Sequence, residues 1–222
     1  MKRGAYDKFL TVLLAILIIC IIGTAGYLVY KYYQKFKLNT DADEFLNEFD
    51  EYVNDIDDEP LYNEEVENQA IKEQTSGGVR GISTNALTYK GYTVAGKLEM
   101  PTINLQYPVL EQMTDANAIE VSVAIQYGVG LNNIGNTVII GHNYRSGLFF
   151  GSNKKLQIGD TIYITDWATG TRRAYTIYNK YTTEEADTSF YNRNTNGTRE
   201  VSLVTCQSNN SYRLVVLARE AG

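Results

Sequence analysis

The chain has 222 residues, room for one domain of roughly 130–150 residues plus attachments. Its formal net charge of −6 is unevenly distributed, because residues 41–67 hold 13 of the 26 acidic residues and no lysine or arginine. From Arg80 onward the chain has 13 basic and 11 acidic residues, so no basic patch that would bind nucleic acid stands out. Only two cysteines are present, Cys20 in an apolar run and Cys206 far from it, so no internal disulfide is expected.

The N-terminal segment predicts a membrane anchor. Three basic residues within the first eight precede residues 9–30, a run of 22 residues without charge and rich in leucine and isoleucine. A helix of this length spans a bilayer. The competing interpretation is a cleaved signal peptide, which would have a shorter apolar core and a small-residue cleavage site, and residues 23–26 offer only a weak one. We therefore expect an uncleaved anchor within a first region of residues 1–37.

The orientation of this anchor does not follow from the flanking charges. Lys31, Lys35 and Lys37 balance the basic residues at the N-terminus. Long C-terminal domains are translocated largely regardless of such charges. We therefore expect a single-pass protein of the cell membrane, with the N-terminus in the cytoplasm and the domain outside.

Residues 38–86 are predicted to form an acidic stalk. Apolar side chains recur there at helical spacing, at Phe45, Phe49, Tyr52, Val53 and Ile56. This spacing indicates an amphipathic helix that packs against the domain or a neighbouring chain. The alternative is a regulatory segment that covers a site. Polarity rises after Pro60, and residues 74–78 are interpreted as a flexible joint.

From residue 87 the apolar pattern has a period of two, which predicts an all-β domain over residues 87–222. Strands are expected over residues 92–100, 103–110, 137–142, 160–165, 173–178, 202–206 and 213–219. Pro108 indicates an edge or a bend in the second of these strands. A short helix is expected over residues 115–126, capped by Thr114 or Asp115. Residues 143–156 are expected to be irregular or briefly helical, and residues 180–198 to be a polar loop.

Three chemically capable side chains, Cys206, His142 and Arg213, lie at ends of predicted strands. Taken singly, a cysteine in a strand is most often a buried small hydrophobe, and a lone histidine or arginine is usually structural or solvated. One histidine and one cysteine without clustered carboxylates also make a poor metal site, so no metal or cofactor is expected.

Taken together, the three side chains suit attack on an amide through an acyl-thioester. A nearby cation favours the thiolate, which is the nucleophilic form of cysteine. An imidazole can act as general base on a thiol or as general acid on a leaving amine. A guanidinium does not transfer protons at neutral pH, but its fixed donors can hold a carbonyl or a developing oxyanion.

The residues around these positions resemble the sortases, the cysteine transpeptidases of Gram-positive cell surfaces. Residues 201–206, Val-Ser-Leu-Val-Thr-Cys, look like the T-x-T-C type strand end of this family. Arg213 opens the next apolar strand, as the arginine of the family does, and Gly141-His142-Asn143 closes an apolar strand, as its histidine does. The resemblance covers about residues 90–219, and the three motifs in this order are specific.

This resemblance implies a closed eight-stranded β-barrel with one or two short helices and the site at one end. It implies that Cys206 attacks a Thr–Gly-like bond in the C-terminal sorting signal of a secreted surface protein. His142 would protonate the leaving amine and later deprotonate the incoming one, and Arg213 would hold the substrate carbonyl. Thr205 would help to form the substrate groove. The acceptor would be an amine of a peptidoglycan precursor or of a pilin.

The sortase class stays open on sequence alone. Gly-His-Asn followed by Gly147-Leu-Phe-Phe-Gly151 resembles class B, but the interval from His142 to Cys206 is too short for the helix that class B inserts there. The Leu-Val-Thr-Cys run is closer to pilin-type enzymes, and the connection from Cys206 to Arg213 is tight. Two other interpretations stand beside a transpeptidase: a non-catalytic extracellular barrel that binds peptides, and a plain cysteine peptidase.

Overall fold

A computed structural model of the chain describes residues 3–58, 87–113, 115–207 and 211–222. The predicted joint at residues 74–78 and the possible cap Thr114 lie outside the described residues. The chain divides into two compact units, Met1–Asp41 and Ala42–Gly222. The second unit carries the β-sheet and every site residue predicted above.

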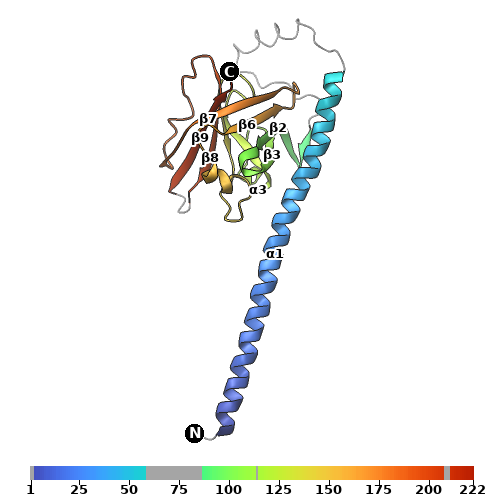
Figure 1. The fold of residues 1–222 in the computed structure, drawn as a ribbon, viewed down its shortest axis with the longest axis vertical. Coiled ribbons are helices and arrows are strands. Elements are labelled where there is room, and N and C mark those ends of the chain that lie inside the picture. The colour runs from blue at the N-terminus through green and yellow to red at the C-terminus, as the bar shows by residue number, and fades with distance from the viewer. Residues whose placement is uncertain (1–2, 59–86, 114, 208–210) are drawn as a thin grey trace. The chain divides into compact units, whose positions relative to one another are not determined.

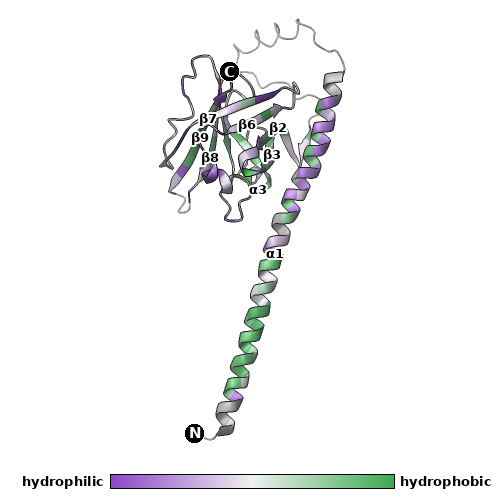
Figure 2. Ribbon diagram, in the orientation of Figure 1, coloured by the Kyte–Doolittle hydropathy of each residue, from purple (hydrophilic) through white to green (hydrophobic). Residues whose placement is uncertain are grey.

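The predicted anchor and the predicted amphipathic helix form one continuous helix, α1 (Arg3–Asp58) (Figure 1). No glycine or proline interrupts the sequence between residues 27 and 58, so nothing local breaks the helix there. Figure 2 shows the N-terminal half of α1 as mostly hydrophobic and its C-terminal part as mixed. Within the described residues, α1 is the helix that is long and apolar enough to cross a membrane.

The C-terminal part of α1 packs against the domain, as the apolar spacing predicts. Phe49 is fully buried, and its ring centroid lies 5.4 Å from that of Trp167. Tyr52 stacks on the same indole, with the ring centroids 4.2 Å apart. Asp50 forms an ion pair with Lys97, whose side chain is almost completely buried. A buried ammonium needs such a partner, so this part of α1 belongs to the folded domain.

Eight strands close into a barrel, as expected (Figure 1). The sheet order is β2-β3-β4-β5-β8-β9-β7-β6, and β6 pairs back with β2. The β3–β4 and β5–β8 pairs are parallel and the others antiparallel. The strands are β2 (Tyr92–Met100), β3 (Leu105–Leu110), β4 (Val123–Gly128), β5 (Gly135–Ile140), β6 (Thr161–Asp166), β7 (Arg172–Glu184), β8 (Arg199–Cys206) and β9 (Tyr212–Glu220).

Short elements fill the connections. A two-residue strand, β1 (Thr88–Tyr89), pairs with β2 and ends the sheet on that side. The 3₁₀ helix η1 (Pro101–Ile103) follows β2, so Pro101 stops the strand as predicted. The 3₁₀ helix η2 (Phe150–Lys155) lies in the segment expected to be briefly helical. In β3, Pro108 pairs only with β2, and pairing with β4 starts at Val109.

Three predicted boundaries are wrong. The helix expected over residues 115–126 is only α3 (Ala118–Val121), because Ser122 is extended and the apolar residues after it pair as β4. The polar loop expected from residue 180 begins after Glu184, because β9 supplies a backbone ladder along all of β7 regardless of its polar side chains. The strand expected over residues 137–142 is β5, which ends at Ile140.

Alternating side chains of β5, β8 and β9 build two apolar layers. One layer fills the barrel and includes Ile139, Leu203 and Val216. The other lies on the opposite face of the same strands and includes Val138, Val204 and Val215, with Phe190 packed over them. Because side chains alternate along a strand, the position of a residue relative to these two layers fixes the face on which it lies.

Candidate active site

The end of β8 brings Cys206 level with His142. Along the parallel pair, Gly135 lies opposite Arg199 and Ile140 opposite Val204, an offset of 64 residues that also separates His142 from Cys206. The pairing continues past the end of β5. The amide of Gly141 donates to the carbonyl of Val204 at 3.2 Å, and Nδ2 of Asn143 donates to the carbonyl of Cys206 at 2.6 Å. His142 therefore lies between two residues that are both tied to the end of β8.

The antiparallel β8–β9 pair brings Arg213 to the other side of the thiol. Cys206 and Arg213 are direct partners in this ladder. Directly opposite residues in antiparallel strands have Cβ atoms roughly 4.5–5.5 Å apart and point to the same face. His142, Cys206 and Arg213 thus form one row across the ends of three neighbouring strands. We call this the His–Cys–Arg row.

The row lies on the outer face of the barrel. Cys206 is two residues after Val204 and Arg213 is two residues before Val215, so each lies on the same face as a valine of the outer apolar layer. Cys206 carries a free thiol that is partly exposed, and 29% of the His142 side chain is exposed. Thr205 falls on the other face and is buried. Its hydroxyl donates to the carbonyl of Gly141 at 2.7 Å and so fastens the two strand ends together.

Two carboxylates approach His142 and Arg213. Oε1 of Glu120, on α3, lies 2.8 Å from Nε2 of His142. Glu185, which follows β7, forms an ion pair with Nη2 of Arg213, and its amide donates to the carbonyl of Ser211 at 3.0 Å. Sequence reasoning missed both carboxylates, because they come from segments whose position no strand pattern predicts.

Tyr144 completes the surroundings of His142. Its hydroxyl donates to Oε2 of Glu120, and its ring centroid lies 5.1 Å from that of His142. Burial, followed by the hydrogen bond and the charge of Glu120, raises the pKa of the Tyr144 phenol to about 12. Tyr144 therefore stays protonated at neutral pH and serves as a donor to Glu120.

Residues 185–198, which we call the β7–β8 segment, cover the outer apolar layer beside the row. Phe190 is buried in that layer and Tyr191 packs at its edge. Burial raises the pKa of the Tyr191 phenol, and the positive charge of Arg213 partly opposes this rise. The segment contains turns but no helix.

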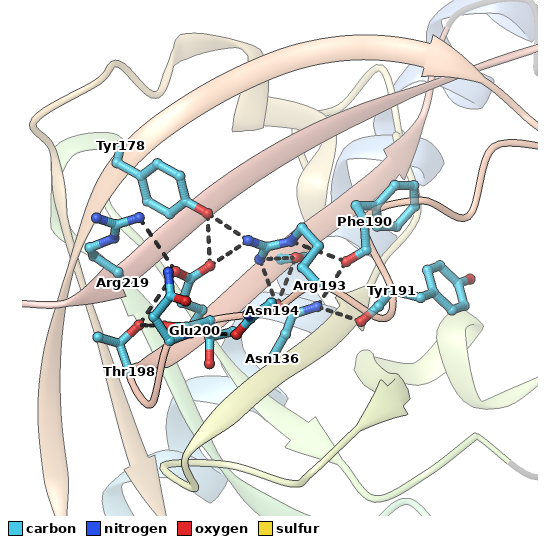
Figure 3. Close-up of polar contacts among 12 residues, drawn as sticks. Asn136, Tyr178, Phe190, Tyr191, Arg193, Asn194, Thr198, Glu200 and Arg219 are labelled. Atoms are coloured by element: carbon cyan, nitrogen blue, oxygen red, sulfur yellow. Dashed lines mark hydrogen bonds and ion pairs between the residues drawn. The ribbon is translucent and has the colours of Figure 1, made fainter.

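Arg193 fastens this segment to the strands (Figure 3). Its guanidinium forms an ion pair with Glu200 of β8 and donates to Oδ1 of Asn136 of β5 at 2.9 Å. Nδ2 of Asn136 donates to the carbonyl of Phe190 at 2.9 Å. Tyr178 donates to Glu200 at 2.7 Å. Because Glu200 is almost fully buried, this network holds the segment firmly over the outer face.

The row has the composition of a site for acyl transfer. Cys206 can supply a thiolate, His142 can give and take a proton, and Arg213 can hold a carbonyl oxygen. Within the described ranges, no three or more histidine, cysteine or acidic residues gather where they could hold a metal ion.

Comparisons with known proteins point to one family. The profile of the sortase family, described as the sortase domain, matches residues 98–221. Sortase A of Bacillus anthracis is 29% identical over 126 residues, which cover 55% of this chain and 58% of that protein. The chain thus spans less than two thirds of that relative.

Solved sortase structures share the barrel. Sortase A from Corynebacterium diphtheriae superposes with a TM-score of 0.53 and 25% identity, over 59% of this chain and 62% of that chain. A sortase D5 transpeptidase from Clostridium perfringens gives a TM-score of 0.55 and 20% identity, over 84% of this chain and 99% of that one. The chain belongs to the sortase family. Its relatives carry names from several classes, so the class stays open.

Proposed function

We propose that this chain is a membrane-anchored cysteine transpeptidase that cleaves a C-terminal sorting signal and transfers the protein to an amine. Membership of the sortase family supports a transpeptidase role. The observation that supports the proposal is the His–Cys–Arg row, in which strand pairing and the contacts of Gly141 and Asn143 bring a thiol, an imidazole and a guanidinium to neighbouring strand ends.

In the first step, the Cys206 thiolate attacks the carbonyl carbon of the scissile peptide bond. The guanidinium of Arg213 holds the carbonyl oxygen as negative charge develops on it. The carbon–nitrogen bond then breaks and the His142 imidazolium gives its proton to the departing amine. The product is an acyl-thioester between Cys206 and the new C-terminus of the secreted protein.

In the second step, the amine of the acceptor attacks the thioester. His142, now neutral, takes a proton from this amine, the carbon–sulfur bond breaks and the thiolate is restored. The acceptor is an amine of a peptidoglycan precursor or a lysine of a pilin. Thr205 contributes to the substrate groove through the backbone, because its hydroxyl fixes the two strand ends that carry His142 and Cys206.

The anchor places this chemistry at the cell membrane. We propose residues 1–37 as the anchoring region, residues 38–86 as the stalk and residues 87–222 as the catalytic barrel, with the stalk helix packed on the barrel. Residues 9–30 span the bilayer, with the N-terminus in the cytoplasm. Exposed tyrosines lie at the end of this run and directly after it, at Tyr27, Tyr30, Tyr32 and Tyr33. Such rings favour the membrane–water interface.

The orientation is tested with intact protoplasts that produce the chain with an N-terminal epitope tag. External protease should remove the barrel and leave the tagged N-terminus protected. Protection of the barrel in intact protoplasts, with digestion after lysis, would mean the opposite orientation.

The activity is tested with labelled peptides that vary around a Thr–Gly-like bond, with and without an added amine. We expect the amine to appear in the product, and a thioester on Cys206 to be trapped when the amine is omitted. Cys206→Ala should abolish cleavage. Peptide binding without cleavage, unchanged by Cys206→Ala, would identify a binding barrel. Hydrolysis that gains nothing from an amine would identify a plain peptidase.

A further inference from the structure

We infer that Glu120 positions His142 for the proposed transfer and stabilises the protonated imidazole. Glu120 acts through His142 and has no contact with the thiol in this arrangement, so it is a positioning residue. The inference rests on the proposed function, because it gives Glu120 a part in the two proton transfers assigned to His142.

The side chains of His142 and Tyr144 both contact the carboxylate of Glu120. Oε1 of Glu120 lies 2.8 Å from Nε2 of His142, and Oε2 accepts the hydroxyl hydrogen of Tyr144. The contact with Nε2 has the distance of an ion pair but lacks the direction of a hydrogen bond. Its strength therefore depends on charge, and it is attractive when His142 is protonated.

Glu120 is held by a packed element although its own side chain is half exposed. Ala118 is buried and Ile119 and Val121 pack in the same apolar cluster as Phe49 of α1. These residues fix α3 against the barrel and α1. The hydroxyl of Ser122 donates to the carbonyl of Pro108 at 2.5 Å and fixes the end of the helix. The backbone of Glu120 is therefore placed by the core, and Tyr144 fixes the orientation of its carboxylate.

Among the charged groups near His142, Glu120 is the carboxylate that contacts the imidazole. Cys206 lies on the neighbouring strand and Arg213 beyond it in the same row. Arg213 has a carboxylate of its own in Glu185. Tyr144, on the same loop as His142, is neutral because its pKa is raised to about 12, chiefly by burial. An opposite charge within ~4–6 Å favours the charged form of a group, and Glu120 supplies that charge to the imidazole.

The contact also decides which nitrogen can reach the substrate. Nε2 is buried against Glu120. Nδ1 is therefore the nitrogen left to give its proton to the leaving amine. In this arrangement a carboxylate orients the proton donor from behind, as a third group does in other nucleophile–base pairs.

The test compares Glu120→Gln and Glu120→Asp with the unchanged chain, using the full protein in detergent. Glu120→Gln keeps the size of the side chain and an acceptor for Tyr144 but removes the charge. We expect kcat to fall roughly tenfold with KM nearly unchanged. The alkaline limb of the pH–rate profile should move to lower pH, because the carboxylate beside the imidazole has lost its charge. Glu120→Asp should recover part of kcat and of the pH profile.

Glu111→Gln is the matched control, because Glu111 is an exposed carboxylate that directly follows β3 and lies outside the row. It should behave as the unchanged chain. A Glu120→Gln variant with unchanged kcat and pH profile would overturn the inference. So would a loss of kcat that follows a lower melting temperature without a moved pH limb. If Cys206→Ala still cleaved peptide, the proposed function itself would fail instead.

Discussion

Strand pairing, together with the contact of Asn143 with the carbonyl of Cys206, positions the thiol between its two neighbours. Cys206 pairs with Arg213 across the β8–β9 ladder and is level with His142 across the parallel β5–β8 pair. A change of one residue in register would move Cys206 to the inner face. The members of the row lie on paired strands or directly after one. The two carboxylates that approach the row, Glu120 and Glu185, come from connecting segments.

At the residue scale, Arg213→Lys should not restore the proposed activity. An ammonium keeps the charge but lacks the planar fork that can hold a carbonyl oxygen while it also contacts Glu185. We expect kcat/KM for a sorting peptide to fall at least a hundredfold, in the range found when one oxyanion donor is removed. The melting temperature should change little, because the side chain lies at the end of the ladder.

The control for this change is Arg172→Lys, which alters an arginine that pairs with Glu99 away from the row. Its activity should match that of the unchanged chain. Near-normal turnover by Arg213→Lys would remove Arg213 from the role of carbonyl donor.

Sequence motifs reveal the three members of the row, because each stands where an apolar strand ends. They do not reveal Glu120 or Glu185. Glu120 falls within a stretch whose propensity predicts a longer helix, and Glu185 falls within a polar stretch that predicts a loop. Their contacts with His142 and Arg213 depend on how non-local strand pairs place α3 and the end of β7, and a single sequence does not contain this information in readable form.

At the element scale, Arg193 holds the β7–β8 segment on the outer face. Arg193→Met removes the closer of the two arginines that pair with Glu200, whose side chain is 3% exposed, and leaves only the 3.5 Å contact of Arg219. Breaking a buried pair by removing one partner leaves an uncompensated charge and costs about 3 kcal/mol or more. Tyr178 and Thr198 still contact Glu200. We therefore expect the free energy of unfolding, measured with denaturant, to fall by about 3 kcal/mol, the lower end of this range.

Two variants make this prediction specific. Arg219→Met should cost less than about 1 kcal/mol, because Arg219 is half exposed and lies 3.5 Å from Glu200. Adding Glu200→Gln to Arg193→Met should recover part of the loss, because it removes the unpaired charge. Equal losses for Arg193→Met and Arg219→Met would contradict a buried anchor.

A second element-scale prediction concerns the ends of β7, β8 and β9. Burial would raise the pKa of Glu220, but hydrogen bonds from Arg199 and Arg173 outweigh it and lower that pKa below the ordinary 4.5. A lowered folded-state pKa contributes stability above the unfolded value, and this stability is lost as pH falls through the folded value. Glu220→Gln should therefore lose about 1 kcal/mol of stability at pH 7, relative to the unchanged chain.

This difference should shrink as pH falls below about 4.5 and vanish in stronger acid, where both chains are neutral at this position. Unfolding by urea at several pH values measures it, with Glu111→Gln as the exposed control. A constant difference between the two chains at all pH values would mean that packing, and not charge, accounts for the loss.

Local sequence predicts several strands correctly, whereas the helix expected over residues 115–126 is only partly helical. The strand over residues 92–100 and the β6–β7 hairpin follow from alternation and turn residues that lie within the element itself. The stretch 115–126 has no glycine or proline and reads as a helix. Its second half is a strand, because Val123 and Ile125 are buried in the barrel, where Val123 pairs with β3 and Ile125 with β5. Tertiary pairing here overrides local propensity.

At the scale of the whole molecule, one helix carries both the apolar run that is long enough to cross a membrane and residues that pack on the barrel. The apolar cluster that buries Phe49 of α1 also contains Ala118 of α3 and Val94 of β2. α3 in turn presents Glu120 to His142. The C-terminal part of α1 is thus linked by packing to the row. The stability of the domain should therefore depend on residues of the predicted stalk.

Phe49→Ala tests this dependence. Phe49 is fully buried, and truncating such a ring typically costs about 3–5 kcal/mol, because the cavity does not close completely. Tyr52→Ala is the matched control, since Tyr52 stacks on the same Trp167 but is 45% exposed, and it should cost about 1 kcal/mol. Denaturant unfolding of the full chain in detergent, followed by Trp167 fluorescence, measures both. The chain has no other tryptophan, so the signal reports this contact directly. If Phe49→Ala were as stable as Tyr52→Ala, the packing of α1 would contribute little to the stability of the barrel, and the folded domain would begin after α1.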